Sequence, residues 1–70
     1  MELKVAQYLT RAANELNLVL GVQYVVAELD GKVVVKEYST TKDGKAVRRV
    51  LPTAPALLKR LVEIEERIGW

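Results

Sequence analysis

The chain has 70 residues, contains neither cysteine nor histidine, and carries 11 basic against 9 acidic side chains. Disulfides and sites built on thiolate or imidazole ligands are therefore excluded, and the net charge of +2 is too small to mark a strongly basic tail. Half of the residues are hydrophobic, a large share for one small domain, and this composition favours self-association.

The first expected element is a helix over residues 2–17. Apolar side chains recur there at spacings of three and four, and charged side chains occupy the other positions. The predicted buried face consists of Val5, Leu9, Ala12, Ala13 and Leu16. Asn17 is a poor helix former and Gly21 breaks the pattern, so we expect the helix to stop near Asn17.

The middle of the chain predicts three β-strands that turn twice. Two Asp-Gly pairs, Asp30-Gly31 and Asp43-Gly44, separate the valine-rich runs, and glycine accepts the positive φ that hairpin turns require. The expected strands cover residues 22–29, 32–40 and 45–51. This spacing predicts an antiparallel meander in the order 1-2-3.

A two-residue loop at the first turn fixes the register of the first two strands. It places Val26 opposite Val35, and Glu28 opposite Val33. The face that is the better candidate for the core then consists of Val22, Tyr24, Val26, Val33 and Val35. The reverse face is interrupted by lysines, but it is too apolar to be left wholly in water.

The second turn leaves the register of the third strand open. The turn can close with three or with four loop residues, and the third strand shifts by one position between the two cases. In one register Arg48 lies opposite Glu37, and in the other Arg49 does. An arginine therefore meets Glu37 in either case, and this pair is interpreted as structural.

Pro52 ends the third strand, and a second helix follows with Thr53 as the expected N-cap. Its apolar stripe contains Leu57, Leu61, Ile64 and Ile68, and Gly69 is the expected stop. The sequence thus predicts a single α+β domain over residues 1–70, an αβββα unit whose antiparallel sheet packs with two helices. At least the second helix is expected on the core face of the sheet, and the place of the first is left open.

The residue chemistry predicts no catalytic, cofactor-binding or metal site. A chain without histidine and cysteine lacks the usual pairs of nucleophile and general base. Asp30 and Asp43 each precede a glycine, so turn formation explains both. The four glycines are dispersed and form no phosphate-binding loop, and the carboxylates show no calcium-loop spacing.

Nucleic-acid binding is an alternative that the basic residues of the meander keep open. The candidate groups are Lys32, Lys36, Lys42, Lys45 and one of Arg48 and Arg49, with Tyr24 and Tyr38 for stacking. Glu28 and Glu37 are expected to dilute this patch. A protein partner is therefore expected in preference to a nucleic acid, and a nucleic-acid-binding module stays the second alternative.

From Leu16 onwards the sequence resembles the flagellar FlaG family. The shared features are an apolar-aromatic strand before a glycine turn, a valine-rich strand, a second glycine turn, a basic-apolar strand, a proline and a leucine-rich helix. They lie at residues 24–31, 32–36, 43–44, 47–50, 52 and 57–61. The resemblance implies a small cytoplasmic protein that takes part in flagellar assembly or filament control, without enzymatic activity and without defined binding residues.

We therefore expect a non-catalytic interaction protein of the cytoplasm that is not bound to a membrane. The expected partner surface consists of Val34, Lys36, Tyr38 and Trp70, although Trp70 can equally pack against the first helix. A homodimer or higher oligomer is expected because the sheet is apolar on both faces, unless the first helix covers the second face. The alternative is a designed or orphan scaffold without a biological function, since turns, strands and helix ends all agree with one fold.

Overall fold

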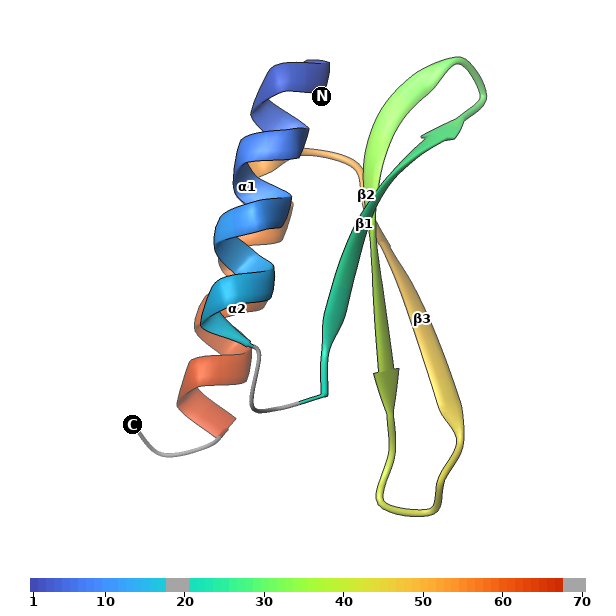
Figure 1. Ribbon diagram of the computed structural model, residues 1–70, viewed down its shortest axis with the longest axis vertical. Coiled ribbons are helices and arrows are strands. Elements are labelled where there is room, and N and C mark those ends of the chain that lie inside the picture. The colour runs from blue at the N-terminus through green and yellow to red at the C-terminus, as the bar shows by residue number, and fades with distance from the viewer. Residues whose placement is uncertain (18–20, 68–70) are drawn as a thin grey trace.

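The computed structural model describes residues 1–17 and 21–67. Its elements follow the order α1 (Leu3–Leu16), β1 (Gln23–Leu29), β2 (Lys32–Thr40), β3 (Ala46–Leu51) and α2 (Ala54–Arg67). The three strands form one antiparallel sheet in the order β1-β2-β3, which confirms the predicted α+β class and the αβββα unit. Both helices lie on the same side of this sheet (Figure 1), so the fold has one helical layer and one sheet layer.

The hairpin between β1 and β2 has the predicted register. Val26 pairs with Val35 and Glu28 pairs with Val33. The two-residue loop has positive φ at both positions, 52° at Asp30 and 75° at Gly31. This is the signature of a type I′ turn, whose twist matches that of the flanking strands and which favours Asp-Gly for this reason.

The hairpin between β2 and β3 closes around Thr41. The Thr41 N–H donates to the Lys45 carbonyl at 2.9 Å, and the Lys45 N–H donates to the Thr41 hydroxyl at 3.1 Å. The loop thus spans residues 42–44 and ends on Gly44, whose φ is 82°. A three-residue loop that ends in a left-handed residue is a common hairpin connection. Of the two registers left open by the sequence, the structure has the one that pairs Glu37 with Arg49.

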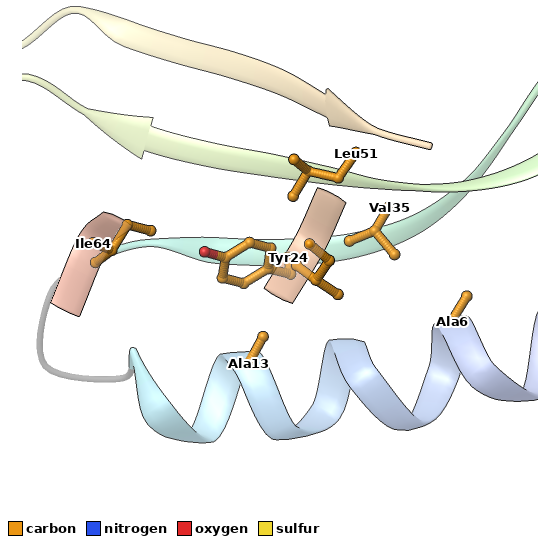
Figure 2. Close-up of a cluster of buried hydrophobic side chains, with 7 residues drawn as sticks. Ala6, Ala13, Tyr24, Val35, Leu51 and Ile64 are labelled. Atoms are coloured by element: carbon orange, nitrogen blue, oxygen red, sulfur yellow. The ribbon is translucent and has the colours of Figure 1, made fainter. Parts of the chain in front are cut away.

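The hydrophobic core lies between the helical layer and one face of the sheet (Figure 2). Its buried members are Ala6, Ala13, Tyr24, Val35, Leu51, Leu57 and Ile64. The strand residues in this set belong to the face that the sequence predicted for the core, and the second helix packs there as expected. The buried residues of α1 are the alanines Ala6 and Ala13. Because these side chains are small, the helix backbone can lie close to the sheet.

The buried face of α1 differs from the predicted one. Ala13 is buried and Leu9 packs against the core as expected, but Val5, Ala12 and Leu16 are exposed, and Ala6 is buried instead. The prediction is thus right at Leu9 and Ala13 and wrong at the other three positions, because the buried side also takes in the small residue Ala6. Asn17, predicted as the stop, is the C-cap of the helix, and its N–H donates to the Ala13 carbonyl.

The predicted start of the second helix is confirmed. The Ala56 N–H donates to the Thr53 hydroxyl at 3.2 Å, so Thr53 is the N-cap. Leu57 and Ile64 are buried and Leu61 packs against the core from the side. Ile68, Gly69 and Trp70 lie outside the described residues. The predictions for Ile68 in the apolar stripe, for Gly69 as the helix stop and for Trp70 as a contact residue therefore stay predictions.

We expect Leu57→Ala to lower the free energy of unfolding by about 3 kcal/mol, because it opens a cavity at a fully buried position. Leu58→Ala is the matched control on the same helix, where the leucine is 51% exposed. It should change the free energy by less than about 1 kcal/mol. Urea unfolding followed by circular dichroism measures both, and equal losses in the two variants would contradict the described orientation of α2.

Candidate functional site

The side of the sheet that faces away from the helices is the candidate functional surface, and we call it the open face. It follows from strand alternation and register, which place every second residue of each strand on this side. Its members are Gln23, Val25, Ala27 and Leu29 of β1, Lys32, Val34, Lys36, Tyr38 and Thr40 of β2, and Ala46, Arg48 and Val50 of β3. Several large apolar residues in this set are about two-fifths exposed, so the face presents apolar surface to solvent.

The open face contains three of the four residues predicted for a partner surface. Tyr38 is exposed and Lys36 is half-buried, and they stand two positions apart on the central strand. Val34 lies on the same face beside Ala27, but it is only 3% exposed and offers little surface to a partner. Trp70 lies outside the described residues.

Two cross-strand rows define the centre of the open face. In one row Val25, Lys36 and Val50 lie side by side across the three strands. In the next row Tyr38 lies between Gln23 and Arg48. Each row therefore places a cation, Lys36 or Arg48, beside an exposed apolar or aromatic side chain.

The strand residues of the open face include cations but no carboxylate. Lys32, Lys36 and Arg48 belong to it, whereas Glu28 and Glu37 alternate to the helix side of the sheet. The expectation that these two glutamates dilute the basic patch is therefore wrong. Tyr24 is buried beneath the helices, so its predicted role as a stacking group is wrong as well.

On the other side of the sheet, the buried carboxylate of Glu37 links the strands to α2. The Glu37 side chain is 1% exposed. Its oxygens accept hydrogen bonds from Arg60 Nε at 3.0 and 3.1 Å, from Arg60 Nη2 at 3.0 Å and from the Tyr24 hydroxyl at 3.0 Å. Arg49, one of the two arginines predicted as a partner, has its Nε 3.9 Å from the nearer Glu37 oxygen, and its side chain is half-exposed. The main partner is thus Arg60, which the sequence analysis did not connect with Glu37.

This cluster shifts two pKa values, and both shifts favour the protonated forms that donate hydrogen bonds to Glu37. Burial, followed by the hydrogen bond to Glu37, raises the pKa of the Tyr24 hydroxyl well above its usual value, so it stays a donor. The hydrogen bond to Glu37 also raises the pKa of the Arg60 guanidinium. Since the carboxylate is surrounded by donors from its own chain, the cluster serves to hold α2 on the sheet.

A groove runs between α1 and the free edge of β1. At one end the Asn14 amide pairs with the backbone of Tyr24: its Nδ2 donates to the Tyr24 carbonyl at 2.9 Å, and the Tyr24 N–H donates to Oδ1 at 2.6 Å. The groove measures about 600 Å³, and its lining consists of Gln7, Thr10, Arg11, Asn14, Glu15 and Val26. The Thr10 hydroxyl is buried and makes no hydrogen bond within the described structure. Sequence reasoning missed this groove, although a polar Asn14 inside a helix was a signal.

The described residues contain no group of three or more acidic side chains that could hold a metal ion. Within residues 1–17 and 21–67, neither helix is long and apolar enough to cross a membrane. Comparisons of the chain with protein-family models, with curated proteins and with solved structures returned no match.

We expect Arg60→Met to lower the free energy of unfolding by about 3 kcal/mol, because it leaves the Glu37 carboxylate buried without its main partner. Lys59→Met removes a cation from the exposed side of α2 and is the matched control, with an expected change within about 0.5 kcal/mol. The double variant Glu37→Met, Arg60→Met should recover part of the loss, since no unpaired charge remains. Chemical denaturation at neutral pH measures all three, and a loss no larger than that of the control would contradict the cluster.

The raised pKa of Tyr24 predicts a loss of stability at alkaline pH. Below about pH 10 the hydroxyl is protonated in both the folded and the unfolded chain. Above that pH the unfolded chain releases the proton while the folded chain keeps it, so the free energy of unfolding falls by up to about 1.4 kcal/mol per pH unit. Tyr24→Phe should remove this part of the fall, whereas Tyr38→Phe should not. Urea unfolding between about pH 8 and pH 11 distinguishes the two, and parallel curves for Tyr24→Phe and the wild type would contradict the expectation.

Proposed function

We propose that the protein is a non-catalytic interaction module of the cytoplasm that binds another protein through the open face. The observation that supports this proposal is the placement of both helices on one side of the sheet (Figure 1). The opposite side is left with apolar side chains in solvent, among them Val25, Tyr38 and Val50. Neighbouring apolar side chains that are exposed together on a sheet face are characteristic of interaction sites.

The charges of the open face define the chemistry of the partner. Lys36 and Arg48 flank the exposed apolar groups, and no strand carboxylate offsets them on this face. A segment that combines apolar side chains with aspartate or glutamate would bury the apolar surface and pair with these cations. The ion pairs would mainly set orientation and association rate, and the apolar contacts would contribute most of the affinity.

The flagellar part of the proposal rests on the resemblance to the FlaG family alone. It makes flagellin and the filament-cap protein the first partners to test. If neither of them nor any nucleic acid binds the folded protein, the alternative of a scaffold without a biological role is favoured.

Nucleic-acid binding is the second candidate, and one observation supports it. The cations Lys32, Lys36 and Arg48 share a face with the exposed ring of Tyr38, and Glu28 and Glu37 point to the other side of the sheet. Single-stranded nucleic acids bind to surfaces that combine cations with aromatic rings. A single aromatic ring and three cations make a small site of this kind, so we favour the protein partner.

We expect Lys36→Glu and Tyr38→Ser each to weaken binding of purified flagellin or filament-cap protein by at least about tenfold. Lys59→Glu changes the charge equally on the exposed side of α2 and should leave the affinity unchanged. Calorimetric titration measures the affinities, and circular dichroism checks the fold of each variant.

Titration of the protein with short single-stranded DNA and RNA at several salt concentrations tests the alternative of nucleic-acid binding. Sub-micromolar binding there with a steep loss in salt would overturn the protein-partner proposal.

A further inference from the structure

The free edge of β1 has a defined set of backbone groups. β1 is an outer strand of the sheet, so every second residue directs its N–H and carbonyl away from β2. Asn14 takes both of these groups at Tyr24, which shows that Tyr24 belongs to the outward-directed set. By the same alternation Val26 and Glu28 direct their N–H and carbonyl groups into the space beside β1.

The groove described above lies along this edge. Val26 of β1 lines it together with residues of α1, among them Arg11 and Glu15. The guanidinium of Arg11 can pair with an anion, whereas the Thr10 hydroxyl is buried and makes no hydrogen bond in the described structure. An added strand at this edge would therefore meet the free backbone groups of Val26 and Glu28 beside the polar side chains of α1.

We propose that two copies of the chain form a symmetric dimer through antiparallel pairing of their β1 edges. The register follows from which positions are free. Pairing Val26 with Glu28 of the second copy uses both free positions in both copies and gives two hydrogen-bonded pairs, each of two bonds. Pairing Val26 with Val26 brings Glu28 against Tyr24, whose groups are held by Asn14. Pairing Glu28 with Glu28 sets like charges together and brings Val26 against Asp30, which belongs to the turn.

The side chains match in this register on both faces of the sheet. On the helix side, Glu28 of the second copy lies opposite Val26 and reaches the groove, where the Arg11 guanidinium can donate to its carboxylate. On the open face, Val25 lies opposite Leu29 of the second copy, and Ala27 lies opposite its own counterpart on the two-fold axis. Val25 and Leu29 are each more than two-fifths exposed in the single chain, so the dimer covers apolar surface that is otherwise wet.

The dimer has a consequence for the open face, although it does not depend on the function proposed for that face. Two three-stranded sheets would join into one continuous sheet with all helices on the same side. The open faces of the two copies would then form one surface with Lys36 and Arg48 repeated across the two-fold axis. Edge pairing also removes the exposed β1 edge, which is a site for unwanted strand pairing in a single chain.

Cysteine cross-linking tests the register directly, because the natural chain has no cysteine. Ala27 would lie in a non-hydrogen-bonded pair with its counterpart, with about 4.5 Å between the two Cα atoms, a separation within the disulfide range of about 4.4 to 6.8 Å. We expect Ala27→Cys to form a disulfide-linked dimer under mild oxidation. Val50→Cys places the thiol on the opposite edge strand and should not cross-link. Cross-linking of Val50→Cys without Ala27→Cys would overturn the proposed interface.

Sedimentation equilibrium at tens of micromolar tests the assembly itself, and the expected mass is twice the 7.9 kDa of the chain. Glu28→Lys and Arg11→Glu should each weaken the dimer by at least about tenfold, and the double variant should recover most of the loss, because it restores opposite charges in the groove. Glu65→Lys is the control for the same change of charge on the exposed side of α2. A wild-type mass of 7.9 kDa, or a dimer that is insensitive to both reversals, would overturn the proposal.

Discussion

The fold depends on how the buried carboxylate of Glu37 is neutralised. It lies on the central strand under the helical layer, where an unpaired charge would cost several kcal/mol. Arg60 supplies the countercharge from α2, and the Tyr24 hydroxyl adds a donor from β1. These contacts join α2 and β1 to the central strand on this side of the sheet. Apolar packing alone specifies such an arrangement less sharply, because the reverse face of this sheet is apolar as well.

The helical layer uses two different ways of approaching the sheet. α2 contributes large side chains, Leu57 and Ile64, and the Arg60 ion pair. α1 contributes two buried alanines and the half-buried Leu9, and its Asn14 amide adds a polar contact with the backbone of β1. Because both helices occupy one side, the open face and the edge of β1 are left uncovered by the described residues. We propose a partner protein for the open face and a second copy of the chain for the edge of β1.

Local signals in the sequence predicted the helices, strands and turns, but they did not predict polar contacts between residues far apart in the chain. The Asp30-Gly31 pair fixed a type I′ turn, and that turn fixed the register of two strands, because side chains alternate with a period of two. Apolar spacing predicted the buried side of α1 only in part: Leu9 and Ala13 pack as expected, but the small residue Ala6 is buried and Val5 and Leu16 are not. The partner of Glu37 was sought on the neighbouring strand and lies on α2, at position 60, which no periodicity connects with position 37. The open face was recognised as partly apolar, but whether Arg48 or Arg49 lies on it required the register of β3.

The central claim is that the helices cover one face of the sheet and leave the other for binding. NMR relaxation of side-chain protons in the presence of a soluble paramagnetic agent tests this claim most directly. The account predicts strong broadening for Val50 and Tyr38 of the open face, and little effect on Val35 and Leu57 of the core. Protection of Val50 and Tyr38 equal to that of Val35 in the unbound protein would contradict it, because it would mean that the open face is already covered.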